Sequence, residues 1–190
     1  MFKLEPPKRI PFYLKFGIWI SEKVTGKKML PARLLSWSPR SAIGSAFLES
    51  LVVHKDPTLS KRLLKLVRLQ VSFKVNCPFC IDMNGYDFEL FKITLEELNL
   101  IRENCYPVQH NAFNQREQIA LEYALRLSVT PPDLDENFQN TLKTMFTDRE
   151  TVVLTGTISQ VNYWTRLVQG FNVPSAGFRQ DCSLSSPPKK

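Results

Sequence analysis

Apolar residues recur at helical spacing along most of the chain. Between residues 58 and 73, for example, Leu59, Leu63, Leu66 and Val71 fall on one face of a helix. Strict alternation of apolar and polar residues, which would indicate strands, is not sustained between turn signals. The pattern therefore predicts an all-α fold. The expected helices cover residues 13–24, 41–53, 58–73, 77–91, a segment starting at 94, 114–127, 135–146 and 147–170.

Several helix starts are marked by capping boxes, in which a threonine or asparagine precedes a glutamate by three residues. The two side chains then satisfy free backbone amides reciprocally at the beginning of the helix. The segments with this form are Thr94–Glu97, Asn114–Glu117 and Thr147–Glu150. They support three of the expected boundaries independently of the apolar pattern.

The last expected helix carries apolar residues on more than one side. Its run from Val152 to Val168 includes Trp164 and Leu167. A helix of this kind lies in the centre of a core or is shared with a second subunit. Because a chain with an extended arm would otherwise leave these side chains in water, we expect a homo-oligomer, a dimer or a multiple of it.

The two ends of the chain differ from its middle. Prolines at positions 6, 7, 11, 31 and 39 favour an N-terminal arm with short helices over residues 1–40. Residues 41–178 form the expected helical domain. Beyond Phe178 the sequence runs into SLSSPPKK, and we expect residues 179–190 to be a disordered tail.

Composition and charge narrow the class of protein. With 43% apolar and 23% charged residues over 190 positions, the chain has the profile of a globular domain. The net charge of +7 raises the question of a nucleic-acid or membrane partner, but the basic residues are interleaved with acidic ones, so we expect neither. No segment approaches the roughly 20 apolar residues of a membrane span, and no signal-peptide pattern is present, which predicts a cytoplasmic location.

Cys77 and Cys80 form the most informative motif. With too few cysteines for a disulfide framework, a Cys-x-x-Cys pair indicates redox chemistry or metal binding. Asn76 is expected to cap a helix that starts at Cys77 and places Cys77, Cys80 and Asn84 on one face. The positive end of the helix dipole favours thiolate, which attacks peroxides and disulfides, and the second thiol then closes an internal disulfide.

Two other interpretations of the pair stay open at this stage. A zinc site would need two further ligands, whereas Cys105 and Cys182 are isolated and His54 and His110 are the only histidines. We therefore expect no metal and no cofactor. The alternative is a pair of buried structural cysteines, since a free cysteine often packs as a small apolar side chain.

Residues 63–91, which contain NCPFCIDMN, and residues 113–167 resemble the carboxymuconolactone decarboxylase/AhpD-like family, and Trp37–Arg40 suits its longer members. The resemblance implies a compact helical bundle and homo-oligomers. It also implies peroxide reduction or disulfide transfer, with a thiol-containing protein as electron donor. By the same resemblance, Cys80 attacks the peroxide and Cys77 is its partner.

Two positions depart from the family's pattern. Asn84 stands in place of a histidine and Lys65 in place of a glutamate, which together form a proton relay in active members. Asparagine cannot accept a proton near neutral pH, and lysine is no carboxylate, although a nearby cation itself favours thiolate. His54 or His110 is the candidate for a replacement base.

The leading functional hypothesis is a thiol-dependent oxidoreductase of antioxidant defence, a peroxidase or disulfide reductase with Cys77, Cys80 and Asn84 at its site. Loss of both relay residues favours a second class, a degenerate member that binds a ligand or protein without turnover. A lactone decarboxylase is a third hypothesis, which the dithiol disfavours because those enzymes do not rely on one. Asp82 and Asp87, near the dithiol, are interpreted as ordinary partners of the helix dipole.

Overall fold

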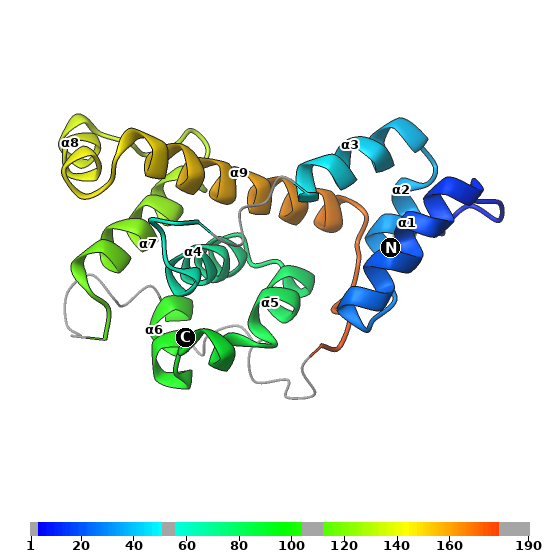
Figure 1. Ribbon diagram of the computed structural model, residues 1–190, viewed down its shortest axis with the longest axis horizontal. Helices are drawn as coiled ribbons and strands as arrows, with labels where there is room; N and C mark the ends of the chain where they lie inside the picture. The colour runs from blue at the N-terminus through cyan, green and yellow to red at the C-terminus, as the bar shows by residue number, and fades with distance from the viewer. Residues whose placement is uncertain (1–3, 51–55, 104–111, 179–190) are drawn as a thin grey trace.

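The computed structural model describes residues 4–50, 56–103 and 112–178, so the expected tail at 179–190 lies outside it. Within these ranges the regular structure is helical, without a strand, which confirms the all-α prediction (Figure 1). None of these helices is long and apolar enough to cross a membrane. The elements are α1 Phe12–Thr25, α2 Leu30–Leu35, α3 Pro39–Ser50, α4 Lys61–Lys74, α5 Pro78–Gly85, η1 Phe88–Phe91, α6 Leu95–Glu103, α7 Gln115–Leu127, α8 Glu136–Met145 and α9 Asp148–Gly170.

α4 lies at the centre of the domain. It begins three residues after the expected start, because the Ser60 side chain accepts a hydrogen bond from the Leu63 amide and caps the helix there. Every residue from Leu63 to Ser72 is buried, and α9, α7, α5 and α6 pack against the helix (Figure 1). A helix enclosed along this length fixes the position of the segment that follows it, which carries the dithiol.

Two apolar clusters built on α4 form the core. The first joins α4 to α7, α8 and α9 and includes Val67 and Ile158. The second joins α4 to α5, η1, α6 and α7 and includes Leu69 and Ile101. Burial of each such aliphatic side chain stabilises the fold by about 1.5–3 kcal/mol before entropy is counted.

All three expected capping boxes are present. In each, the side chain of the threonine or asparagine accepts from the glutamate amide, and the carboxylate accepts from the amide of the capping residue. The glutamates are buried and pair with arginines of other segments: Glu97 and Glu117 with Arg62, and Glu150 with Arg116. The boxes therefore both start the helices and tie them to their neighbours.

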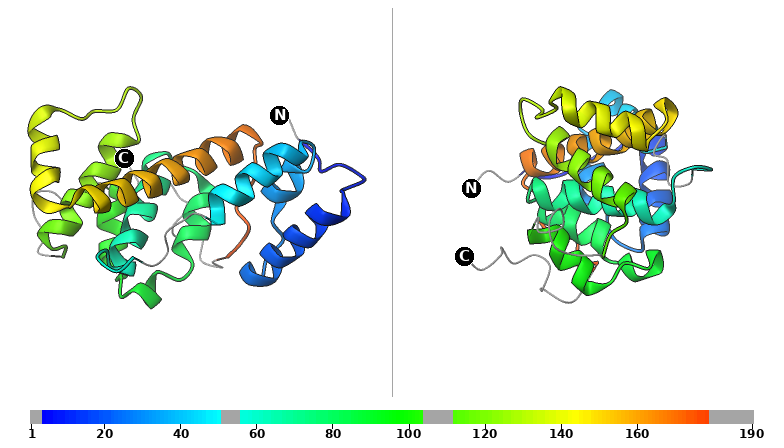
Figure 2. Two further views of the ribbon diagram at one scale, coloured as in Figure 1. Left: turned by 45° about the horizontal axis from the view of Figure 1, so that its top comes forward. Right: turned by 90° about the vertical axis from the view of Figure 1, so that its left-hand side faces the viewer.

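α1, α2 and α3 lie together at one end of the molecule, beside the C-terminal part of α9 (Figures 1 and 2). The hydroxyls of Ser45 and Tyr163 share a hydrogen bond of 2.6 Å, and the Trp164 ring nitrogen donates to Glu49 at 2.8 Å. α3 thus packs with the helices of the arm and connects them to α9.

The helix expected over residues 77–91 is shorter, and that boundary was wrong. α5 ends at Gly85, and the chain turns before the 3-10 helix η1. The turn places Phe88 in the second apolar cluster and brings Asp87 to Lys65, two contacts that a continued helix would not make. Glycine weakens a helix interior by about 1 kcal/mol, so the break falls where helical propensity is lowest.

α9 is apolar on more than one side, as expected, but a single chain already uses much of that surface. Trp164 and Leu167 are half-buried against the segment that holds the dithiol. The homo-oligomer stays a prediction, and the two side chains that motivated it have partners within the chain.

Candidate functional site

The two cysteines of the motif lie together at the start of α5. Their sulfur atoms are 2.6 Å apart, and the side chains are 1% and 2% exposed. The expected cap at Asn76 was wrong by one residue, because Cys77 itself caps the helix and its sulfur accepts from the Cys80 amide at 3.4 Å. Asn76 instead adopts a left-handed backbone with a φ of 50°, which asparagine tolerates better than most residues.

This geometry makes the two thiols unequal. The hydrogen bond between the two thiols, together with the backbone amides of Cys80 and Phe79, lowers the pKa of Cys77 against the opposing effect of burial. The same hydrogen bond, burial and the neighbouring thiolate raise the pKa of Cys80 far above its usual range. The arrangement favours a thiolate on Cys77 and a protonated Cys80, whereas the family resemblance assigned the attack to Cys80.

Hydrogen bonds to α4 hold the dithiol from one side. The Cys77 amide donates to the Ser72 carbonyl at 3.2 Å, and the Asn84 side-chain amide donates to the Ser72 hydroxyl at 3.0 Å. Ser72 is fully buried, and its hydroxyl donates to the Arg68 carbonyl at 2.8 Å. Asn84 therefore contributes by anchoring α5 to α4, a role that an amide can fill and that needs no titration.

α9 holds the turn that precedes the dithiol. The Gln169 side chain donates to the carbonyls of Val75 and Asn76 at 2.9 and 3.3 Å. These bonds occupy backbone acceptors in the turn between α4 and α5. The position of Cys77 is thus set by α4, α5 and α9 together.

Lys65, the second departure from the family pattern, points to a different partner. It is buried, pairs with Asp87, and lies over the rings of Phe91 and Tyr86. Burial lowers the pKa of Lys65, although its hydrogen bond to Asp87 acts in the opposite direction. In the part of the chain that the structure describes, no hydrogen bond joins Lys65 to Asn84, so the two positions do not form a relay.

Apolar side chains from distant segments cover the dithiol. The cluster that contains both cysteines draws on the N-terminal arm, α5, α9 and the segment after α9. Its other buried members are Leu34, Phe79, Val168 and Val173, and its half-buried members are Leu4, Met29, Leu30, Met83, Trp164, Leu167, Phe171 and Ala176. We call these side chains the apolar cover. Both sulfur atoms are buried within this cluster.

Asp82 fastens the segment after α9 to α5. Its buried carboxylate accepts from the Ser175 hydroxyl at 2.7 Å and from the Phe178 amide at 3.0 Å. The Phe178 ring also packs on Tyr86, with ring centroids 5.3 Å apart. The interpretation of Asp82 as a helix-dipole partner was therefore wrong: it lies beyond the first turn of α5 and latches part of the apolar cover.

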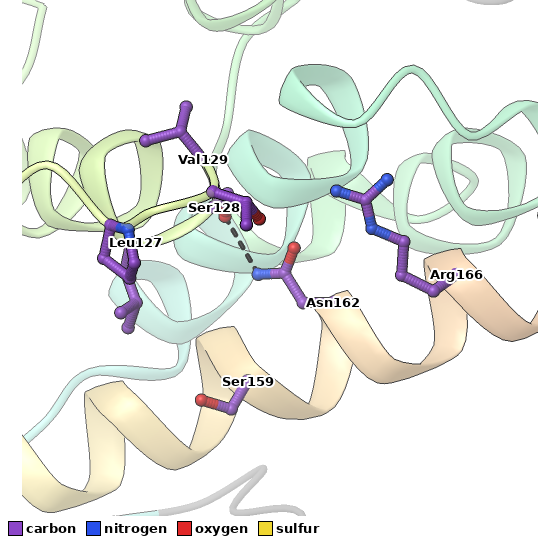
Figure 3. A pocket seen from close by; sticks show the side chains of 8 residues that line it. Leu127, Ser128, Val129, Ser159, Asn162 and Arg166 are labelled. Atoms are coloured by element: carbon purple, nitrogen blue, oxygen red, sulfur yellow. Dashed lines mark hydrogen bonds between the residues drawn. The ribbon is translucent and has the colours of Figure 1, made fainter.

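A separate hollow of about 280 Å³ lies where the end of α7 faces α9 (Figure 3). The Asn162 amide donates to the Ser128 hydroxyl across it, and Arg166 lines one side. No member of the apolar cover lines this hollow, and its cation sits near the negative end of α7, which already attracts positive charge. We assign it no chemistry.

The remaining candidates for metal binding or a replacement base cannot be placed. Among residues 4–50, 56–103 and 112–178, no three His, Cys, Asp or Glu side chains gather as a metal site. His54, His110, Cys105 and Cys182 all lie outside these ranges.

Comparison with known proteins identifies the fold. No family model matches the sequence. Uncharacterized protein YnjA of Escherichia coli (strain K12) is 24% identical over 174 residues, which cover 92% of this chain and 94% of YnjA.

A peroxidase-related protein from Silicibacter sp. TM1040 has a TM-score of 0.73 at 12% identity, covering 97% of this chain and 93% of its own. A putative antioxidant defence protein AhpD from Agrobacterium tumefaciens has a TM-score of 0.63 at 22% identity, covering 74% and 94%. The chain has the AhpD-like fold.

The AhpD-like fold also occurs in a protein with a different described activity. The debrominase Bmp8 has a TM-score of 0.75 at 16% identity, with 92% of each chain covered. A cysteine-to-alanine variant of Bmp8 in complex with 2,3,4-tribromopyrrole has a TM-score of 0.74. The fold alone therefore does not decide the reaction of this AhpD-like chain.

Proposed function

We propose that this protein is a thiol-dependent oxidoreductase of antioxidant defence, which reduces peroxides or disulfides through Cys77 and Cys80. The observation that carries the proposal is the pairing of two sulfur atoms, 2.6 Å apart, with opposite protonation preferences. A thiolate is the nucleophile in both reactions, and a neighbouring thiol is the group that resolves the product. A purely structural pair of cysteines would need neither the helix cap nor this asymmetry.

The reaction with a peroxide follows from this protonation pattern. The Cys77 thiolate attacks the terminal oxygen of R–O–OH, the O–O bond breaks, and the alkoxide takes the proton of the Cys80 thiol to leave as R–OH. Cys77 is then a sulfenic acid, and the Cys80 thiolate attacks its sulfur, which forms the Cys77–Cys80 disulfide and releases hydroxide. A thiol or dithiol donor returns both cysteines to the reduced state. In this scheme Cys80 supplies the proton that the leaving alkoxide takes. The histidine and glutamate relay of the resembled family is then not needed for this step.

The apolar cover favours organic over strongly hydrated substrates. Leu34, Val173 and the rings of Phe79 and Trp164 lie around the sulfur atoms. Polar molecules lose hydration in such surroundings without regaining hydrogen bonds. We therefore expect an alkyl hydroperoxide to be reduced faster than hydrogen peroxide.

A turnover assay tests the proposed function. Cumene hydroperoxide is supplied with dithiothreitol as electron donor, and its loss is followed for the parent, Cys77→Ser and Cys80→Ser. We expect turnover in the parent and loss of it in both variants, while Cys105→Ser and Cys182→Ser serve as thiol-removal controls and keep it. If the parent shows no turnover above the background reaction of dithiothreitol alone, the second hypothesis gains. That hypothesis, suggested by Asn84 and Lys65, is a protein that binds a ligand without catalysis.

A second candidate is reductive dehalogenation of a small aromatic ring. The aromatic side chains of the apolar cover, Phe79, Trp164 and Phe171, and the likeness to Bmp8 favour it. The dithiol would supply two electrons, the ring carbon would gain a proton in place of bromine, and bromide would leave as the Cys77–Cys80 disulfide forms. Bromide release from a brominated pyrrole, measured with the same variants, distinguishes this reaction from peroxide reduction.

A further inference from the structure

α1 carries two apolar faces, of which the chain covers one. Leu14 and Ile18 are buried, and α1 packs against α3. Across the helix, Phe12 is 85% exposed, Phe16 63% and Trp19 54%, and Tyr13, Ile20 and Val24 are exposed beside them. Contiguous bare aromatic surface of this kind marks a binding face on a protein. We call these six side chains the aromatic face.

The exposed charges of the stretch that carries the aromatic face are of one sign. The exposed charged residues between positions 8 and 28 are Lys8, Arg9, Lys15, Lys23, Lys27 and Lys28. The carboxylate in this stretch, Glu22, is half-buried and bound by Arg33 at 2.8 Å. Lys23 lies 5.1 Å from the centre of the Trp19 ring, within the face itself. The single acidic residue of this stretch is thus neutralised by Arg33, and its exposed charges are basic.

We propose that α1 docks on the surface of an anionic membrane, with its aromatic face in the headgroup region and its lysines on the lipid phosphates. Interfacial helices combine an aromatic or aliphatic face with flanking Lys and Arg in this manner. Tryptophan and tyrosine favour the boundary between water and acyl chains, and clustered basic residues are attracted to anionic lipid. This proposal replaces the expectation that the protein has no membrane partner.

The charge pattern favours lipid over a second copy of the chain. A two-fold contact brings the same patch of both subunits together. If two copies met through the aromatic face, the lysines of one copy, including Lys15 and Lys23, would lie near those of the other. No exposed carboxylate between positions 8 and 28 would balance these charges. An anionic membrane offers an apolar region for the rings and negative charge for the lysines.

Docking through α1 would bring the neighbouring helix α2, which contributes to the apolar cover, toward the lipid. α2 follows α1 after a short turn, and its Leu30 and Leu34 belong to the apolar cover. A hydroperoxide carried in the bilayer would reach the sulfur atoms through the element that adjoins the docked helix. This link to lipid hydroperoxides rests on the proposed function, whereas the docking itself does not.

Co-sedimentation with vesicles tests the docking on the full chain. Phosphatidylcholine vesicles with about one third phosphatidylserine are compared with vesicles of phosphatidylcholine alone. We expect binding to the anionic vesicles that weakens with added salt. The double variant Phe16→Ser/Trp19→Ser should bind about ten-fold more weakly or worse, while Leu90→Ser, at an equally bare site on η1 that is 82% exposed, should bind like the parent.

Charge reversal supplies an independent arm of the test. Lys23→Glu/Lys27→Glu should lose about five-fold in binding for each charge, whereas Lys61→Glu/Lys143→Glu, on α4 and α8, should not. The proposal is overturned if the parent ignores anionic vesicles or if Phe16→Ser/Trp19→Ser binds them as well as the parent. It is also overturned if light scattering shows a dimer that this double variant dissociates. Thiol oxidation measured without vesicles reports on the proposed function separately.

Discussion

The two sides of the dithiol are built from different interactions. Toward α4, the Ser72 carbonyl and hydroxyl hold Cys77 and Asn84 by hydrogen bonds of 3.2 and 3.0 Å. On the other side, the apolar cover gathers Leu34 and Val173 from segments far away in the chain, held mainly by packing. We call the first the polar floor.

The difference separates two properties of the site. The polar floor sets the position of the sulfur atoms, because directional bonds tolerate little displacement. The apolar cover sets access, because packed side chains and a terminal segment open at lower free energy than a buried helix. Changes to the floor should therefore alter chemistry and stability, and changes to the cover should alter how fast reagents arrive.

The largest effect is expected from comparing the two single cysteine variants, Cys80→Ser and Cys77→Ser. Cys80→Ser keeps a hydroxyl that can donate to Cys77, so the low pKa of Cys77 should keep its alkylation by iodoacetamide fast as pH falls below the ordinary cysteine pKa of about 8.5. In Cys77→Ser the neighbouring thiolate is gone, but burial still raises the pKa of Cys80. The Cys80 thiol should therefore react on the order of 100-fold more slowly at pH 7 than Cys77 does in Cys80→Ser, and its rate should rise with pH. The reverse ranking would restore the assignment of the attack to Cys80.

Ser72→Ala tests the polar floor directly. The half-buried Asn84 amide loses its acceptor, so the free energy of unfolding in urea should fall by about 0.5–1.5 kcal/mol. Ser50→Ala is the matched control, since its exposed hydroxyl donates to the Phe47 carbonyl and should matter by less than about 0.5 kcal/mol. Equal stability of the two variants would show that the floor is not held by this bond.

Asp82→Asn tests the latch of the apolar cover. Loss of the charge weakens the bonds to Ser175 and Phe178, so the segment should open more often and the native dithiol should be alkylated about ten-fold faster. Asp133→Asn, at an exposed position, provides the control. Alkylation of Asp82→Asn at the parent's rate would mean that access does not pass under this segment.

The smallest effect is expected from Asn84→His. Imidazole one turn after Cys80 can take a proton, but only above its own pKa of about 6.5, so a gain of a few-fold in peroxide reaction should appear above that pH and vanish below it. Adding Lys65→Glu should add nothing to the gain, because the side chain at position 65 pairs with Asp87 and has no hydrogen bond to position 84. If the double variant reacts no faster than the parent, the site has diverged beyond the relay, and a binding role becomes the better account.

The polar floor was more accessible to sequence reasoning than the apolar cover. Cys77, Cys80 and Asn84 fall on one helix within eight residues, so spacing alone brings them together. The cap was still misplaced by one residue, because the left-handed backbone of Asn76 depends on the turn out of α4.

The roles of Asp82 and of the arm could not be predicted from local patterns. Asp82 meets Ser175 across 93 positions of the chain, and no spacing rule connects them. A helix over residues 13–24 was expected from the sequence, but which face of α1 is buried depends on where the neighbouring helices pack. The positions of helices follow from local sequence signals, whereas the apolar cover and the hydrogen bonds of Asp82 depend on tertiary contacts.

Disulfide mapping after a single oxidation tests the central claim most directly. The reduced protein is treated under native conditions with one equivalent of an alkyl hydroperoxide, free thiols are blocked, and peptides are identified by mass spectrometry. We predict a Cys77–Cys80 disulfide, marked by the loss of two hydrogen atoms and reversed by dithiothreitol. Recovery of both cysteines as blocked free thiols would contradict the account.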